Sequence, residues 1–289
     1  MVKLAVENQL KPKGLLNNVN TCFFNSSMQC LLSIDDFTRF VMKTKFDRNS
    51  QPISYLLQEF VGDYKASSHS YNPSKFIQQI KTYIPLFRGR QEDAHEFFNV
   101  LLDKFIEENK DSPIEKLFAI ETEDTIICLE CNYTSPRKFH SNIHHLLIKK
   151  NVHTSLKYYV EHIDDIDDDS PYTCDKCMKR VSAQIQHDIL DTSSYIIIYL
   201  NRFNNINNSF QKNTTPIEVE KELTVNDKSY ILIGVVCHMG SLSSGHYLAF
   251  CKRNERYYVF NDNFYEKTTK MKFKSDTPYF LFYKNKDLE

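Results

Sequence analysis

The amino-acid sequence predicts an α+β fold in which a helical part precedes a β-rich part. Between residues 53 and 105, apolar residues recur with the period of amphipathic helices. After about residue 115 the pattern changes to short β-branched and aromatic runs, which are typical of strands. The 289 residues are 41% hydrophobic and 25% charged, a composition typical of a globular chain of two ordinary domains or one large lobed domain. A cleft between the two parts is a natural place for a site.

Four helices are expected in the first part. One begins near Thr21 and runs to about Leu32, and the second spans residues 53–64, whose apolar side chains share one face. The third opens at Asn72-Pro73, with proline in the first turn, and ends before Pro85. The fourth spans residues 94–105.

The second part contains seven apolar runs of strand length, which we expect to form an antiparallel sheet with many strands covered on both faces. They are residues 125–127, 143–148, 195–200, 230–236, 246–251, 257–260 and 279–283. An acidic run at 164–169 and an Asn-rich run at 204–208 are expected to be solvated surface loops.

Charge and apolar patterning exclude several classes of protein. The 36 Lys and Arg nearly balance the 37 Asp and Glu, so the chain lacks the basic excess typical of nucleic-acid binders. The longest apolar run, residues 230–237, has strand length, so no membrane helix is expected. The first 14 residues lack the apolar segment of a secretory signal. We therefore expect an intracellular protein, cytoplasmic or nuclear, without nucleic-acid or membrane partners.

Two Cys-x-x-Cys pairs, 42 residues apart, form the candidate metal site. Each pair presents two sulfurs to one ion, and two pairs complete a tetrahedral zinc site. A redox pair or two disulfides are the alternatives. The four candidate ligands are Cys128, Cys131, Cys174 and Cys177. Three other cysteines, Cys30, Cys237 and Cys251, are expected to be inert core thiols.

Cys22 stands at the expected start of the first helix. Helix N-termini carry free N–H groups and partial positive charge, which favour the reactive thiolate. Asn20 or Thr21 is expected to cap this helix, and the Asn17 amide is a candidate donor to an oxyanion formed by attack of Cys22. A small buried cysteine at a helix start is the alternative.

His246 opens a strand after a Gly/Ser-rich segment, and Asn261 and Asp262 end another strand about 15 positions later. This spacing suits neighbouring antiparallel strands. A histidine is well suited to take a thiol proton near neutral pH, and an Asn or Asp beside it fixes the tautomer. Alone, each segment also fits a structural role, as a core histidine or a polar turn.

Together these segments resemble the ubiquitin-specific proteases, papain-like cysteine peptidases that remove ubiquitin. Residues 14–31 resemble the family's G-L-x-N-x-G-N-T-C box, and residues 238–247 match its H-x-G-x4-G-H-Y box. Residues 257–262 resemble W-x-x-F-[ND]-D, and 91–97 resemble Q-Q-D-A-x-E-F. Leu-Asn-Arg-Phe at 200–203 resembles L-K-R-F, and the resemblance extends from Gly14 to about Tyr283.

The resemblance implies a papain-like cysteine peptidase fold with a helical thumb, an antiparallel β palm and zinc-bearing β fingers. Residues 1–13 would be an N-terminal extension and 14–289 the catalytic domain. Within that domain the thumb would span about 14–115 and the fingers and palm about 116–285, with the fingers including 120–190. The Cys-x-x-Cys pairs would close the fingertips around structural Zn²⁺.

The resemblance also assigns roles in catalysis. Cys22 would be the nucleophile, His246 the general base, Asn261 the residue that orients it, Asn17 the oxyanion donor and Asp262 a supporting residue. The reaction would be hydrolysis of the isopeptide or peptide bond after the last glycine of ubiquitin, through a thioester and without a cofactor in the chemical step. The expected partners are ubiquitin and ubiquitinated proteins, acted on by a monomer.

A second set of residues is expected to bind substrate. Asp93 and Glu96 lie three positions apart on one face of the fourth helix, away from its apolar stripe. In the family such acidic residues meet the basic tail of ubiquitin, whereas a solvated helix face is the alternative. Gln91, Gly245 and Tyr247 complete the expected substrate-binding set.

Three positions depart from the family pattern: Val19 replaces a glycine, Tyr257 a tryptophan and Asn201 a lysine. A β-branched residue tolerates a positive φ poorly, so Val19 raises the alternative of a catalytically weak or inactive ubiquitin-binding relative. Two further alternatives are a protease for another ubiquitin-like modifier and a zinc-ribbon nucleic-acid binder, which neutral charge disfavours.

Overall fold

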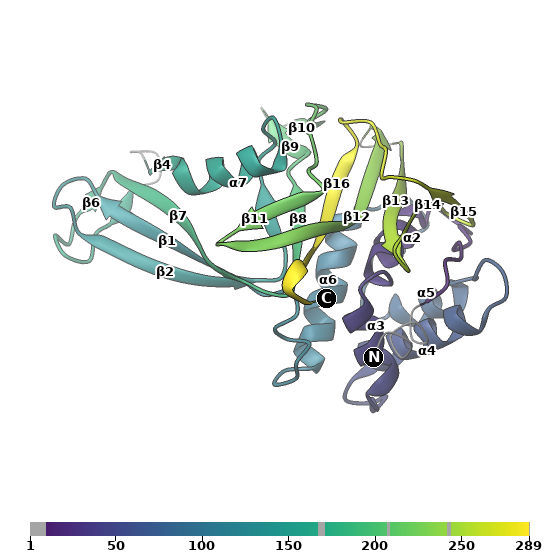
Figure 1. Cartoon of the computed structure of the whole chain (residues 1–289). Helices are drawn as coiled ribbons and strands as arrows, with labels where there is room; N and C mark the ends of the chain where they lie inside the picture. Colours follow the sequence, from purple (N-terminus) through teal and green to yellow (C-terminus); the bar gives the residue numbers. More distant parts are fainter. Residues whose placement is uncertain (1–9, 167–170, 207–208, 242–243, 289) are drawn as a thin grey trace.

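A helical lobe, a central β-sheet and a projecting distal sheet make up the molecule (Figure 1). The computed structural model describes residues 10–166, 171–206, 209–241 and 244–288. The distal sheet extends away from the helical lobe, with the central sheet between them (Figure 1). None of the described helices combines the length and apolar character needed to span a membrane.

The helical lobe is built around α2, whose ten residues are all buried. Phe23 and Phe24 of this helix pack against a group of aromatic rings that includes Phe60, Phe76 and Phe97. The helices of this lobe are α2 (Cys22–Leu31), α3 (Asp35–Lys43), α4 (Pro52–Ala66), α5 (Ser74–Ile80) and α6 (Ala94–Glu108). Burial of α2 on all sides fixes the position of Cys22 at its N-terminus.

The central sheet has the strand order β15-β14-β13-β12-β16-β8-β3 within the described residues, and β11 pairs with β12. Its strands are β3 (His144–Leu146), β8 (Tyr195–Leu200), β11 (Glu222–Val225), β12 (Lys228–Gly240), β13 (Gly245–Arg253), β14 (Arg256–Asn261), β15 (Phe264–Thr268) and β16 (Pro278–Asn285). β8 is buried at every residue, which explains its continuous apolar run. Because α2 packs against β12, β13 and β14, the helical lobe covers one face of this sheet.

The distal sheet has the order β2-β1-β7-β4 among the described residues. Its strands are β1 (Ile120–Cys128), β2 (Thr134–Ser141), β4 (Ile163–Ile166) and β7 (Ala183–Thr192). Smaller elements are α7 (Val152–Glu161), the strand pairs β5 (Tyr172–Thr173) with β6 (Arg180–Val181) and β9 (Phe203–Ile206) with β10 (Ser209–Lys212), and the terminal 3₁₀ turn at Lys286–Leu288.

The structure confirms the four expected helices and the seven expected strands, with three corrections to the helices. α5 ends at Ile80 rather than at Pro85, because the chain continues in tight turns that still bury Ile84. α3 and α7 were not predicted. Both are short, with three buried residues each, so their apolar period is weak in the sequence.

The expectation of a purely antiparallel sheet is wrong for one pair, since β3 pairs with β8 in parallel. α7 and distal strands lie between these two strands in sequence, a long crossover that allows both to run in the same direction. The two polar runs are also not simple loops. Asp164 and Asp165 belong to β4, and residues 204–206 belong to β9, while 167–169 and 207–208 lie outside the described residues.

Candidate active site

Cys22 is the first residue of α2 and is 3% exposed. The Asn17 Oδ1 atom accepts hydrogen bonds from the Thr21 backbone N–H (2.9 Å) and hydroxyl (3.2 Å), which fixes the turn into the helix. Thr21 takes the predicted N-cap position of α2, but its side chain makes no cap hydrogen bond, and Asn20 donates to the Gly89 carbonyl instead (3.0 Å). The uncapped N-terminus leaves the helix dipole directed at the thiol.

His246 connects Cys22 to Asn261. β13 and β14 are antiparallel neighbours, as the spacing predicted, and His246 Nε2 lies 2.7 Å from Asn261 Oδ1. An amide oxygen only accepts hydrogen bonds, so Nε2 carries the proton and Nδ1 is left for the thiol. The hydrogen bond with Cys22, followed by that with Asn261, raises the pKa of His246 to about 9 against the opposing effect of burial. This imidazole is therefore a strong base held beside a thiol.

Asp262 joins the central sheet to the helical lobe. Its carboxylate accepts hydrogen bonds from the amides of Asn17 (2.9 Å) and Asn25 (2.8 Å), and its backbone carbonyl accepts from Leu15 (2.8 Å). One Asn17 N–H is thus engaged and its second remains to face an oxyanion. Asn25 is not among the site residues predicted from the sequence; its only signal there is a polar side chain inside an otherwise apolar helix start.

Gln91 fixes the beginning of β13. Its amide donates to the Gly245 carbonyl (2.6 Å) and accepts from the Gly245 N–H (2.7 Å). A Cβ on Gly245 would lie 2.1 Å from His238 Nε2, so only glycine fits there. The expected substrate-binding residues Gln91 and Gly245 therefore contact each other and position His246, the next residue along the strand.

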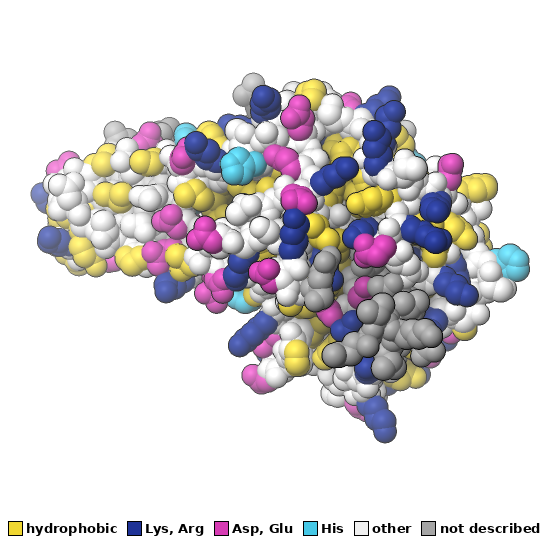
Figure 2. Space-filling view, viewed as in Figure 1, with side chains coloured by type: hydrophobic (Ala, Val, Ile, Leu, Met, Phe, Trp, Pro, Cys, Tyr) yellow, Lys and Arg dark blue, Asp and Glu magenta, His cyan; other side chains and the backbone are white. Residues whose placement is uncertain are grey.

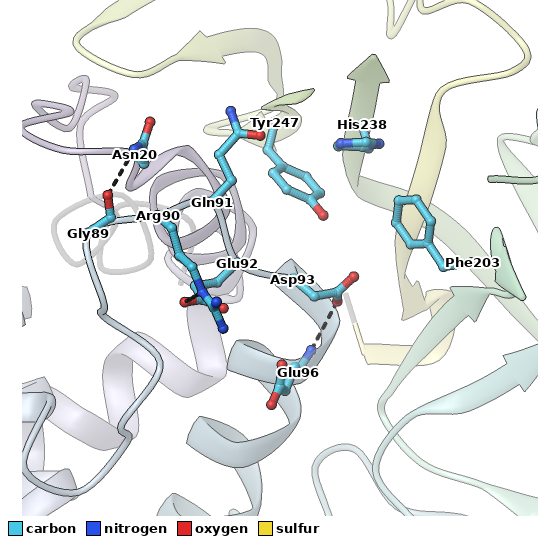
Figure 3. A pocket seen from close by; sticks show the side chains of 10 residues that line it. All are labelled: Asn20, Gly89, Arg90, Gln91, Glu92, Asp93, Glu96, Phe203, His238 and Tyr247. Carbon is cyan, nitrogen blue, oxygen red and sulfur yellow. Dashed lines mark hydrogen bonds and ion pairs between the residues drawn. The ribbon is translucent and has the colours of Figure 1, made fainter. Parts of the chain in front are cut away.

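Asp93 is the N-cap of α6, so its predicted place on one outward face of the helix together with Glu96 is wrong. Its carboxylate accepts from the backbone N–H groups of His95 (2.6 Å) and Glu96 (3.1 Å) and from the Tyr279 hydroxyl (2.5 Å). Burial raises its pKa, and the Tyr279 hydrogen bond opposes that shift. Glu96, by contrast, directs its side chain into a cavity (Figure 3).

This cavity has a volume of about 690 Å³, and its wall includes sequence neighbours of Cys22 and His246. Its wall includes Asn20, two residues before Cys22, and Tyr247, the residue after His246. Figure 3 shows Gln91, Glu96 and Asp93 on one side and Tyr247, His238 and Phe203 on the other. The remaining lining residues are Gly89, Arg90 and Glu92. His238 and Phe203 are not among the site residues predicted from the sequence, because only the folded chain brings their strands to this cavity.

Val19 does not adopt a positive φ; the left-handed residue of this loop is Asn20, with φ of 49°. Asparagine tolerates that conformation better than most residues, and Val19 is 58% exposed. The concern that Val19 distorts the loop is therefore removed.

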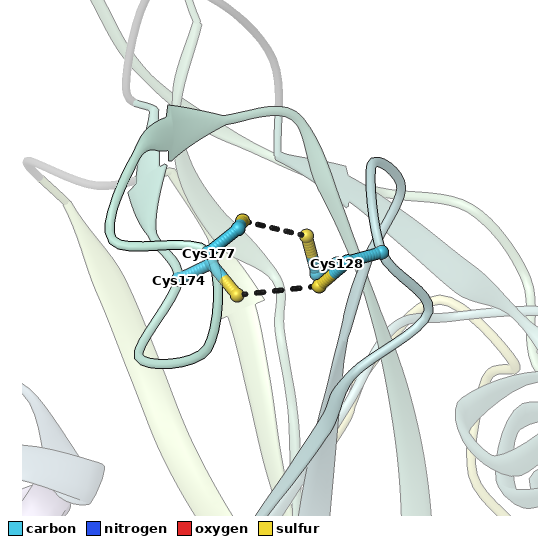
Figure 4. A group of neighbouring side chains, drawn as sticks. Cys128, Cys174 and Cys177 are labelled. Carbon is cyan, nitrogen blue, oxygen red and sulfur yellow. Dashed lines mark hydrogen bonds between the residues drawn. The ribbon is translucent and has the colours of Figure 1, made fainter.

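The four cysteines of the candidate metal site come together at the tip of the distal sheet. Their Sγ atoms all lie within 4.8 Å of one another, with Cys128–Cys177 at 3.9 Å and Cys131–Cys174 at 3.7 Å. Figure 4 shows three of these side chains converging from two turns. Tetrahedral zinc with bonds of about 2.3 Å requires sulfurs about 3.8 Å apart, so the donor set fits zinc. All the cysteines are free thiols, and Cys30, Cys237 and Cys251 are buried in the core, as predicted.

Comparison with known proteins places this site in a family. The family profile described as "Ubiquitin carboxyl-terminal hydrolase" matches residues 13–283. The chain is 27% identical to ubiquitin carboxyl-terminal hydrolase 25 of Arabidopsis thaliana, covering 94% of this chain and 47% of that protein. It is also 27% identical to the probable ubiquitin carboxyl-terminal hydrolase 16 of Schizosaccharomyces pombe, covering 98% of this chain and 70% of that protein. The chain thus spans about half the length of the plant relative.

Solved structures share the fold. A chain of the SAGA DUB module Ubp8/Sgf11/Sus1/Sgf73 bound to monoubiquitin superimposes with a TM-score of 0.81 at 24% identity, covering 97% of this chain and 70% of that one. The same module bound to ubiquitin aldehyde gives a TM-score of 0.80 at 24% identity, with the same coverage. The papain-like arrangement of helical thumb, β palm and fingers is therefore the fold of this chain.

Proposed function

This chain belongs to the ubiquitin carboxyl-terminal hydrolase family, and from that premise we propose that it is a thiol-dependent deubiquitinase. The substrate bond is the isopeptide or peptide bond after the last glycine of ubiquitin. The observation that carries this proposal is the contact of His246 with both Cys22 and Asn261, close in sequence to the cavity residues Asn20 and Tyr247.

Cys22 acts as the nucleophile. His246 takes the thiol proton, and the Cys22 sulfur attacks the carbonyl carbon of the terminal glycine, which pushes the carbonyl electrons onto oxygen. The second N–H of Asn17, together with backbone N–H groups at the start of α2, stabilises that oxyanion. Asp262 holds Asn17 in place through the 2.9 Å hydrogen bond.

His246 then acts as an acid and again as a base. Its proton passes to the departing amine as the C–N bond breaks, leaving a thioester on Cys22. A water molecule attacks the thioester while His246 accepts its proton, and the thiolate leaves. Asn261 keeps the imidazole in one tautomer throughout, because its oxygen accepts from Nε2.

The cavity into which Glu96 points binds the C-terminal tail of ubiquitin. Two tail glycines present only backbone, so they can pass close to the wall of the cavity beside Asn20 and Tyr247. Glu96 faces the basic part of the tail, whereas Asp93 serves as the helix cap that holds the cavity wall.

The four-cysteine cluster holds structural Zn²⁺. Cys128, Cys131, Cys174 and Cys177 fill all four positions, so the ion has no vacancy for chemistry. When bound, it connects the β1–β2 turn to the turn between β5 and β6. This connection stiffens the distal sheet.

Labelling with full-length ubiquitin that carries a thiol-reactive C-terminal group tests the proposed activity. We expect one ubiquitin adduct by intact mass, lost in Cys22→Ala and strongly slowed in His246→Ala. Ubiquitin-like modifiers with the same reactive group serve as competitors. Preferential labelling by one of these modifiers would show that it, rather than ubiquitin, is the substrate. Binding of ubiquitin without any adduct would identify an inactive relative.

Metal analysis of the purified chain tests the zinc site. We expect one zinc per chain, and Cys174→Ser is expected to lose it and to lower the melting temperature. Cys237→Ser, a matched change at a buried thiol away from the cluster, is expected to retain the metal. Retention of zinc in Cys174→Ser would refute the four-cysteine assignment.

A further inference from the structure

Phe264 places an exposed aromatic ring beside the catalytic residues. It is 72% exposed, and in the β14–β15 ladder it lies directly opposite Asn261, the partner of His246. Directly opposed side chains of an antiparallel pair project to the same side, with Cβ atoms about 5 Å apart. The ring therefore flanks Asn261 on the solvent side. No step of the proposed chemistry uses it.

The strand order puts Phe264 on the far side of the catalytic residues from the tail cavity. His238 of the cavity wall lies on β12 and Tyr247 on β13, whereas Asn261 lies on β14 and Phe264 on β15. Since neighbouring strands are about 4.8 Å apart, β15 lies about 10 Å beyond the strand of His246. A tail that fills the cavity and ends at Cys22 directs the leaving amine, and the protein attached to it, toward β14 and β15.

The segment from the start of β15 to residue 274 is basic. Four of the five charged residues between positions 264 and 274 are lysines, and the fifth is Glu266. All four lysines are exposed, and none makes an ion pair in the part of the chain that the structure describes. They are Lys267, Lys270, Lys272 and Lys274. Figure 2 shows Lys and Arg side chains gathered over β13, β14, β15 and the segment that follows.

β15 is also the outermost strand of the central sheet, so its outer edge has no β partner among the described residues. An unpaired edge offers backbone N–H and C=O groups to an added strand. An aromatic ring, an open edge and unpaired lysines together favour an extended, acidic polypeptide as the occupant.

We propose that Phe264 and the four lysines form an acceptor surface that binds an extended acidic segment flanking the modified lysine of the ubiquitinated protein. This inference rests on the proposed deubiquitinase function and adds selectivity for the leaving group. Lysines on an edge strand also prevent unwanted strand pairing, and that role alone would give no selectivity between acceptors.

Three ubiquitin conjugates test this surface. The first carries a small fluorescent amine, and the other two carry peptides joined through a lysine side chain that is flanked by acidic or by basic residues. We expect kcat/KM for the acidic peptide to exceed that for the basic peptide by about tenfold at low salt, and the ratio to fall as salt screens the lysines.

Lys267→Glu/Lys270→Glu is expected to invert the ratio. Phe264→Ser is expected to lower kcat/KM for both peptide conjugates about fivefold, which corresponds to about 1 kcal/mol.

The fluorescent conjugate has no flanking residues, so its hydrolysis should stay within about twofold in every variant and reports an intact site. Lys43→Glu/Lys45→Glu and Leu288→Ser, at exposed positions of the helical lobe and the C-terminal turn, are the matched controls and should change none of the rates. Equal rates on both peptides, or equal losses on all three conjugates, would overturn this inference alone. If none of the three conjugates is cleaved, the proposed function is overturned, and this inference with it.

Discussion

Two residues in the left-handed region of backbone conformation hold the segments of the candidate active site in place. Asn20 (φ 49°) shapes the loop before Cys22, and Asp262 (φ 52°) follows Asn261 directly. Each also makes side-chain hydrogen bonds to another segment, Asn20 to Gly89 and Asp262 to Asn17 and Asn25. Short polar side chains suit both positions because they tolerate a positive φ and form these hydrogen bonds.

Substitutions at Val19 and Asn20 should therefore have opposite outcomes. Val19→Gly is expected to leave kcat/KM within about twofold, because Val19 has no strained backbone to relieve. Asn20→Val should destabilise the loop by about 1–2 kcal/mol and lower kcat/KM, since a β-branched residue would have to adopt a positive φ. Steady-state kinetics with a fluorescent ubiquitin conjugate would measure both. A large gain in activity in Val19→Gly would show that the loop is distorted.

The raised pKa of His246 predicts the alkaline limit of activity. Its pKa rises from 6.5 to about 9, first through the hydrogen bond with Cys22 and also through that with Asn261. The stability that protonated His246 gives the folded state is fully present below pH 6.5 and is lost as pH rises through about 9. We expect kcat/KM to fall as pH rises through about 9, because His246 is then deprotonated and the leaving amine lacks its proton donor.

Asn261→Ala removes one cause of the raised pKa of His246. The fall of kcat/KM at high pH, the alkaline limb of the pH profile, should therefore move to lower pH. Asn261→Asp keeps an acceptor beside Nε2 and should keep the limb at or above its original position. A pH profile of kcat/KM for the wild type and both variants measures the shift. An identical limb in wild type and Asn261→Ala would contradict the role given to this hydrogen bond.

At the scale of secondary structure, α6 carries two acidic residues with different roles. Asp93 caps the helix and bonds to Tyr279 of β16, so it joins the helical lobe to the central sheet. Glu96, one turn later, makes no such connection and lines the cavity. Their spacing in the sequence is that of two residues on one helix face. In the structure, however, Asp93 is the N-cap and Glu96 lies in the first turn, so the two side chains have different surroundings.

Asp93→Ala and Glu96→Ala should therefore differ in kind. Asp93→Ala is expected to lower the free energy of unfolding by about 1–2 kcal/mol through loss of the cap. Glu96→Ala should leave the melting temperature unchanged and raise KM for ubiquitin substrates about tenfold, the cost of one charged hydrogen bond. Thermal melts and steady-state kinetics on both variants separate the two effects. Equal stability losses in the two variants would show that Glu96 also has a structural role.

At the scale of the whole molecule, the site exists only where the helical lobe meets the central sheet. Cys22 and Asn17 come from the helical lobe, and His246, Asn261 and Asp262 come from the sheet. Gly14 lies at this junction, where an added Cβ would come within 2.1 Å of the Asn263 carbonyl oxygen. The close approach lets the Leu15 N–H reach the Asp262 carbonyl (2.8 Å).

Gly14→Ala should force the two parts of the molecule apart. A displacement of about 1 Å at the catalytic residues is expected to lower kcat/KM roughly 100-fold. Gly62→Ala is the matched control: it lies in α4 with open space around its Cα, and it should stabilise the chain by about 0.5–1 kcal/mol without changing kcat/KM. Kinetics and thermal melts on both variants test this. Full activity in Gly14→Ala would show that the junction tolerates the displacement.

The sequence alone predicted four of the helices, seven of the strands and the family to which the chain belongs. Apolar period sets local structure, and the spacing between His246 and Asn261 correctly predicted their adjacent strands. The order of the catalytic segments along the chain also predicted the family. These features depend on residue type and short-range spacing, both of which can be taken directly from the amino-acid sequence.

The backbone conformation and the contacts of individual residues within these segments depend on the tertiary structure. It placed the positive φ at Asn20 rather than Val19 and made Asp93 the half-buried N-cap of α6. It also paired Gln91 with Gly245 and set β3 parallel to β8. Each of these outcomes depends on contacts between segments distant in sequence, whose packing and hydrogen bonds override local preference.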